Sequence, residues 1–133
     1  MITLQILQLL QDNGFGTIDI DLFWEKMGLG KAGVYISSLG EANTRSVRHA
    51  QTYELYSRGD SDVSGYKKLL DIVEFLNSAY RNTCSLPSVQ GSNGETIAEE
   101  LSNVAILPLS SISSNGLDGQ GRTIFSATGR ILY

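Results

Sequence analysis

The stretch from Arg45 to Arg81 changes its hydrophobic period part-way along, and this change constrains the fold more than any other feature. Between Val47 and Tyr56 the residues alternate, which predicts a pleated strand with one drier face. From Val63 onward, apolar residues recur at helical spacing and form one stripe. Only the polar joint Ser57–Asp62 separates the two patterns. The sequence therefore predicts a long strand that leads directly into an amphipathic helix.

Both elements have a face that is expected to be buried. The drier face of the strand holds Val47, His49, Gln51, Tyr53 and Leu55. The stripe of the helix holds Val63, Tyr66, Leu69, Leu70, Val73, Leu76 and Tyr80. Asp60 and Ser61 are good N-cap residues, and Asp62 suits the positive end of the helix dipole.

The rest of the chain completes an α+β pattern. A short helix is predicted from a cap at Thr3 to Gly14, with its glutamines, Gln5 included, facing water. Further strands are predicted at Thr17–Phe23, Val34–Leu39, Val104–Leu109 and Arg122–Tyr133, a helical turn or two at Thr96–Asn103, and polar loops at Asn82–Glu95 and Ser110–Gly121. The order α-β-β-β-α-β-β predicts a single domain over residues 1–133. In it, two helices pack on one face of a four- to five-stranded, mainly antiparallel sheet.

Composition excludes several classes of partner. The chain has 133 residues, 41% of them hydrophobic, which suits one globular core. Its net charge is −4 with no run of Lys or Arg, so we expect no nucleic-acid and no membrane partner. Cys84 is the only cysteine and has no internal disulfide partner. The first residues lack the features of a signal peptide, and we expect a soluble protein that folds in a cytoplasm.

The glycines Gly28, Gly30 and Gly33 have the spacing of a dinucleotide-binding fingerprint. That motif needs a strand before it and a helix after it, so that backbone N–H groups reach the pyrophosphate. Here a predicted strand follows instead. We interpret these residues as a glycine loop between strands.

Asp60, Asp62, Ser64 and Asp71 resemble the spacing of a calcium-binding loop. Asp71 is shorter than the glutamate that usually closes such a loop, and the preceding segment has the pattern of a strand. Capping of the helix explains the acids better. A small calcium-binding module stays open as an alternative function.

Candidates for catalysis are few. His49 is the only histidine and Cys84 the only thiol, and no flanking pattern supports a dyad. Asp19 and Asp21 share one face of a predicted strand, as many solvated acids do. We predict no catalytic residue, no cofactor and no metal site, and hence a protein that is not an enzyme.

Charge is segregated along the chain, and this pattern suits contact between copies. Asp19 and Asp21 lie in an early acidic block, whereas Arg45, Arg48 and Arg58 follow the long strand. In a head-to-tail ring, the acidic edge of one copy meets the basic edge of the next. These five residues are the candidate ring interface.

Two stretches resemble a known family. They are AQTYELYSRGDSDVSGYKKLLDIVEFLN, the strand and helix with their polar joint, and NGLDGQGRTIFSATGRILY, a Gly/Asp-rich turn, a Gly-Arg step and a closing strand that ends in Tyr. Both are similar to the small minor capsid or tail-terminator proteins of long-tailed, siphovirus-like phages. The opening helix and the order of the elements fit the family as well.

The resemblance implies a structural role without a chemical step. Such proteins form a homohexameric ring on the last ring of the tail tube, stop tube polymerisation and present a surface to the neck. The implied partners are further copies of the chain, the tail tube protein and a neck or head-completion protein. The implied location is the head–tail junction of the virion, after folding in the host cytoplasm. Asn82–Glu95 and Ser110–Gly121 are the expected docking segments, and a head-completion or neck adaptor is the alternative role.

Overall fold

The computed structural model describes residues 2–28, 31–43, 49–79 and 83–133. Its helices are α1 (Ile2–Asp12) and α2 (Asp62–Ala79). Its strands are β1 (Leu22–Trp24), β2 (Gly33–Asn43), β3 (His49–Arg58), β4 (Cys84–Leu86), β5 (Val89–Gln90), β6 (Thr96–Ala98), β7 (Leu101–Ile106), β8 (Ser113–Leu117) and β9 (Thr123–Leu132).

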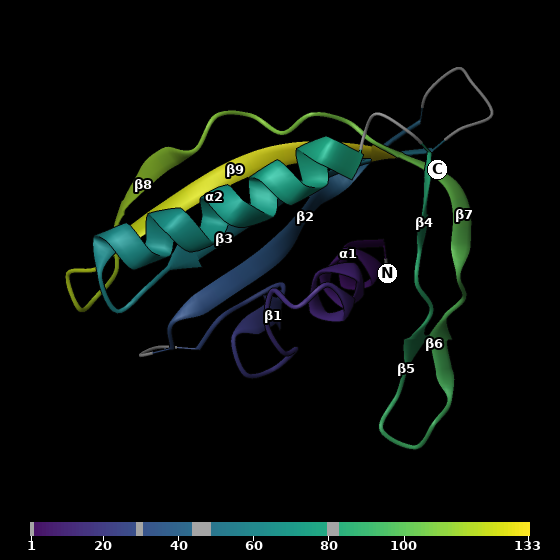
Figure 1. The fold of residues 1–133 in the computed structure, drawn as a ribbon, viewed down its shortest axis with the longest axis horizontal. Coiled ribbons are helices and arrows are strands. Elements are labelled where there is room, and N and C mark those ends of the chain that lie inside the picture. Colours follow the sequence, from purple (N-terminus) through teal and green to yellow (C-terminus); the bar gives the residue numbers. More distant parts are fainter. Residues whose placement is uncertain (1, 29–30, 44–48, 80–82) are drawn as a thin grey trace.

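One large sheet organises the fold. Seven strands pair in the order β1-β2-β3-β9-β7-β4, with β8 also on β9. Every pairing in it is antiparallel except that of β1 with β2. The sheet curls, so that β7 and β4 turn away from the long strands and run past the end of α1 (Figure 1). The α+β class is thus confirmed, with more strands than the four to five predicted.

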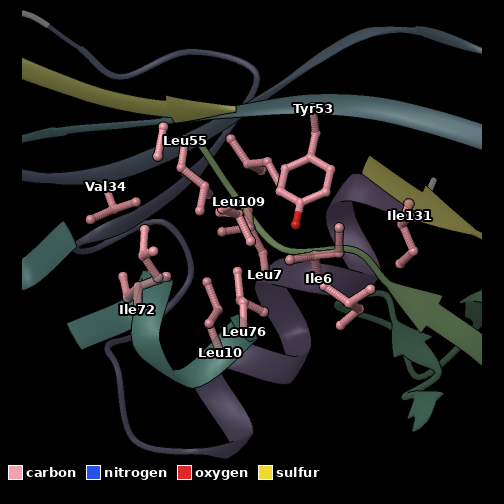
Figure 2. Close-up of a cluster of buried hydrophobic side chains, with 14 of the residues drawn as sticks. Ile6, Leu7, Leu10, Val34, Tyr53, Leu55, Ile72, Leu76, Leu109 and Ile131 are labelled. Carbon is pink, nitrogen blue, oxygen red and sulfur yellow. The ribbon is translucent and has the colours of Figure 1, made fainter. Parts of the chain in front are cut away.

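The core lies between the two helices and the inward side of the central strands. Tyr53 and Leu55 of β3 point toward α1 and α2, where Leu7 and Leu76 meet them (Figure 2). All four side chains are fully buried. The predicted drier face of the long strand is therefore correct at Gln51, Tyr53 and Leu55, whereas His49 is exposed and Val47 lies outside the described residues.

A tight joint sets the rotation of α2. Ser61 and Ser64 cap the helix reciprocally, each backbone N–H donating to the other hydroxyl at 3.1 and 3.2 Å. Ser57 Oγ donates to the carbonyl of Gly65 at 2.8 Å, and a side chain at Gly59 would collide with Gly65. Strand and helix therefore touch through backbone at this point.

This contact rotates the buried stripe from the predicted one. The stripe runs through Gly65, Leu69, Ile72, Val73 and Leu76. Val63 and Tyr66, which were predicted to be buried, are exposed, because backbone contact at Gly65 turns them away from the sheet. Tyr80 lies outside the described residues.

Three other local predictions are corrected. α1 begins at Ile2, so Thr3 is a buried helical residue and not the cap. Residues 96–103 form strands and no helical turn, because they pair with β5 and β4. The two predicted loops contain the short strands β4, β5 and β8. Residues 84–106, called the arm below, form paired strands that reach beyond α1 (Figure 1).

Candidate functional site

A buried ionic network lies where β3 ends. Asp118 Oδ2 lies 2.8 Å from Arg122 Nε and 3.6 Å from Arg58 Nη1. Arg58 also donates from Nε to the carbonyl of Lys31 at 2.6 Å and from Nη2 to the carbonyl of Gly28. One guanidinium therefore ties the segment before β2 to the turn between β8 and β9.

Asp118 is held as a carboxylate. Its Oδ1 accepts the backbone N–H groups of Gln120 and Arg122, at 2.9 and 2.8 Å. Burial is the largest single influence and would raise the pKa of Asp118. The two N–H groups and the Arg122 guanidinium together outweigh it, so the pKa lies below its ordinary value.

The network fixes a surface that we call the projecting end, made of Lys26, Lys31, Val63 and Leu117. Leu117 is 68% exposed at the end of β8, and Val63 is 79% exposed in the first turn of α2. Both lysines are exposed. A bond of 3.1 Å from the Thr123 N–H to Asp62 Oδ1 joins the start of α2 to the β8–β9 turn. Glu25, Asp60 and Asp62 are exposed beside these residues, so the projecting end carries acids as well as lysines around its apolar side chains.

The second surface is a groove of about 470 Å³ between α1, the segment around β1 and the arm. We call it the acidic groove. Its apolar lining consists of Leu4, Ile18, Trp24, Val89 and Ile97. Trp24 and Ile97 remain 40% and 43% exposed. An apolar lining that stays open to solvent is typical of a docking surface.

Two side chains of α1 build this groove. Gln5 is buried, and its Nε2 donates to the carbonyls of Pro87 and Glu99, at 3.2 and 2.7 Å. Gln5 was predicted to face water; it is buried because the arm folds over it. Thr3 Oγ1 accepts the indole N–H of Trp24 at 2.9 Å, which holds the ring at the groove.

The charged residues of α1 and the arm are all acidic. Asp19 lines the groove, Asp12 ends α1, and the arm carries three further acids, all of them exposed: Glu95, Glu99 and Glu100. The sequence has no Lys or Arg in residues 2–19 or 83–106, which include α1 and the arm. The groove therefore presents negative charge around an apolar floor.

The five candidate interface residues are not brought together in what the structure describes. Arg45 and Arg48 lie outside the described residues. Arg58 is buried and its guanidinium is used within the chain, so it serves the fold rather than an exposed contact. Asp19 and Asp21 lie in a turn before β1 and not on one strand face. Asp19 is at the groove, whereas Asp21 accepts the N–H of Thr17 at 2.6 Å.

The calcium-like spacing is distributed along a helix. Asp62, Ser64 and Asp71 all belong to α2, and a helix rises about 1.5 Å per residue, so Asp71 lies more than two turns from Asp62. Asp71 also accepts a bond of 2.6 Å from Lys67 Nζ. Across the described ranges, no group of three or more His, Cys, Asp or Glu side chains has the arrangement of a metal site.

The structure also places three remaining motif residues, Gly33, His49 and Cys84. Gly33 starts β2, so a strand follows the glycine spacing, as the loop interpretation requires. His49 stacks on Tyr133 with ring centroids 5.5 Å apart. Cys84 pairs with Val104 between β4 and β7, and burial raises the pKa of its thiol.

Comparison with models of known protein families finds no match, and neither does comparison with curated proteins. In the part of the chain that the structure covers, neither helix has the length and apolar character needed to span a bilayer.

The arrangement of the two surfaces suits docking. Sequence reasoning missed Gln5, Lys26, Lys31 and Leu117; charge counting by segment was the one signal that pointed to the groove.

Proposed function

We propose that this protein is a tail terminator of a long-tailed phage. It forms a ring, which we take to be a hexamer, on the end of the tail tube. The ring stops tube polymerisation and offers the joining surface for the neck. The protein acts in the virion at the head–tail junction and carries out no chemical step.

One observation carries the proposal. The two stretches that resemble the family fold into neighbouring central strands, with β3 and β9 paired from Ala50↔Leu132 to Ser57↔Phe125. Residues that are distant in sequence thus make one structural unit, with α2 packed on it. A resemblance between short segments gains weight when those segments meet in the fold, because the resemblance then describes one shared unit.

Tube growth in vitro tests the proposal. The tail tube protein of the same phage would be polymerised with and without this protein, and tube lengths measured by electron microscopy. We expect shorter tubes with a capped end, because a bound ring blocks the next addition. Tubes of unchanged length and bare ends would refute the terminator role.

Loss of the protein from the phage separates the two adaptor roles. A missing terminator gives overlong, uncapped tails. A missing neck protein gives tails of normal length that fail to join heads. The second phenotype would move the assignment to the head-completion or neck adaptor.

A further inference from the structure

The acidic groove has the chemistry of a docking site for a cationic partner. We propose that it binds a segment of a different protein chain, one that carries apolar side chains with Lys or Arg beside them. The volume of the groove, about 470 Å³, suits a few side chains rather than a whole protein surface. The inference goes beyond the terminator role, because it assigns the chemistry of a partner and stands whether or not the protein caps a tube.

Trp24 is the anchor of this site. Its indole N–H donates to Oγ1 of the buried Thr3 at 2.9 Å, which holds the ring in place while 40% of the residue stays exposed. Ile97 of the arm lines the same groove and is 43% exposed. A ring that is held before binding loses little conformational entropy when a partner covers it. Tryptophan is also the side chain whose ring face attracts a Lys or Arg cation most strongly.

Three carboxylates lie at the lining of the groove. Asp19 is itself part of the lining. Asp12 Oδ1 accepts the Nε2 amide of Gln8, a lining residue, at 2.9 Å. Glu95 Oε1 occupies the space that a side chain on Gly91, also in the lining, would enter. All three acids are exposed, so their charge acts on a partner that enters the groove.

Among the residues that the structure describes, no Lys or Arg lines the groove. Lys26 follows Trp24 closely in sequence, but it lines a separate cavity together with Glu25. Lys68 Nζ is bound to the carbonyl of Phe15. The carboxylates at the groove are therefore not neutralised within its lining, and a partner that brings cations complements them.

A second copy of this chain is a poor occupant. Each copy has a net charge of −4, so contact between a groove and another copy adds like charge. The exposed apolar side chains Val63 and Leu117 of the projecting end have Glu25, Asp60 and Asp62 beside them, and these acids would meet the acids of the groove. A different chain that brings its own cations meets no such repulsion.

Tryptophan emission tests the inference directly. Trp24 is the only tryptophan in the chain, so its emission reports on the groove alone. The full chain would be titrated with a synthetic peptide of alternating leucine and lysine. We expect the emission to move to shorter wavelength and to saturate, because the ring leaves water. The same peptide with glutamate in place of lysine should cause no shift, and added salt should weaken binding of the lysine peptide.

Two pairs of variants locate the binding and keep Trp24 as the reporter. Ile97→Ala removes part of the apolar lining and should weaken binding about fivefold. Leu39→Ala, at an exposed apolar position outside the lining, should leave binding unchanged. Asp19→Asn removes one charge from the lining and should weaken binding about threefold. Glu74→Gln removes an exposed charge from α2 and should have no effect.

Three results would overturn the inference: no shift with the lysine peptide, an equal shift with the glutamate peptide, or unchanged binding by both Ile97→Ala and Asp19→Asn. A shift that grows with the concentration of this protein alone would place a second copy in the groove and would overturn it as well. Tube length reports separately on the terminator role. Shortened tubes without peptide binding would reject the groove assignment alone, and peptide binding with tubes of unchanged length would reject the terminator role alone.

Discussion

The acidic groove and the projecting end are built by different kinds of buried polar contact. At the groove, a neutral amide, that of Gln5, binds two carbonyls of the arm. At the projecting end, a buried cation, Arg58, joins a carboxylate and two carbonyls. Leu4 and Ile18 of the groove pack against the main apolar core, whereas Trp24 and Ile97, like Val63 and Leu117 at the projecting end, are exposed. The comparison indicates that the core supplies a rigid centre, while separate polar contacts hold each end in shape.

The central side chain is neutral at the groove and charged at the projecting end. A buried charge costs far more to leave unpaired than a buried amide does. The projecting end should therefore be the more sensitive of the two to loss of its central side chain. Each prediction below removes one buried or hydrogen-bonded polar contact and measures the effect on stability or on hydrogen exchange.

The largest effect is expected for Arg58→Met. Two carbonyls lose their donor and Asp118 loses one of its two cations, which should lower the free energy of unfolding by about 3 kcal/mol. Urea unfolding measures the change. Lys67→Met is the matched control, because Lys67 pairs with Asp71 on the exposed face of α2 and should contribute little. A decrease in the free energy of unfolding as small as that of the control would show that the network contributes little to stability.

Gln5→Ala should have a smaller and more local effect. The loss of two hydrogen bonds under the arm should lower the free energy of unfolding by about 2 kcal/mol. Hydrogen exchange should accelerate in residues 84–106 and stay unchanged in β8 and β9. Gln8→Ala is the control, because the only bond of the Gln8 amide described is to Asp12 on the same helix. Equal acceleration at both ends would contradict independent support of the two surfaces.

Tyr53→Phe should stabilise the protein. The hydroxyl of Tyr53 is buried without a hydrogen-bond partner among the described residues, and burial raises its pKa. Removing it should raise the free energy of unfolding by about 1 kcal/mol, because an unsatisfied polar group is taken out of the core. Tyr56→Phe should do the reverse, since that hydroxyl donates to Glu54 at 2.5 Å. A lower melting temperature for Tyr53→Phe would show that the hydroxyl has a hydrogen-bond partner.

Acid should weaken the projecting end first. Because the folded pKa of Asp118 lies below its ordinary value of 3.8, its contribution to stability is complete above that pH. The contribution is lost as the pH falls through the folded pKa, because the carboxylate must then be protonated. Hydrogen exchange in residues 113–123 should rise below that pH before it rises in the arm. An Asp118→Asn chain that shows the same acid dependence would assign the effect to other carboxylates.

Local pattern was sufficient to predict α1, the strand and helix around the polar joint, and the closing strand β9. Each has a clear period within a few turns or pleats. The arm escaped prediction because β4, β5 and β6 are short strands, defined by pairing with residues elsewhere in the sequence. The backbone contact between Gly59 and Gly65 sets the rotation of α2. The spacing of apolar residues does not reveal such a contact, so the buried stripe of α2 was predicted wrongly in part.

The candidate site was harder to foresee for the same reason. Arg58 follows a strand that alternates, so it was expected at a surface; burial there depends on Asp118 and on carbonyls far along the chain. Gln5 is a polar residue of the kind that usually faces solvent on a helix. It is buried only because the arm covers it. The acidity of α1 and the arm was visible in the sequence, but their proximity was not.

Tube growth in the presence of this protein tests the central claim most directly. We predict tubes that are shorter than without the protein and that end in a ring of this chain. Tubes of unchanged length with bare ends would contradict the claim.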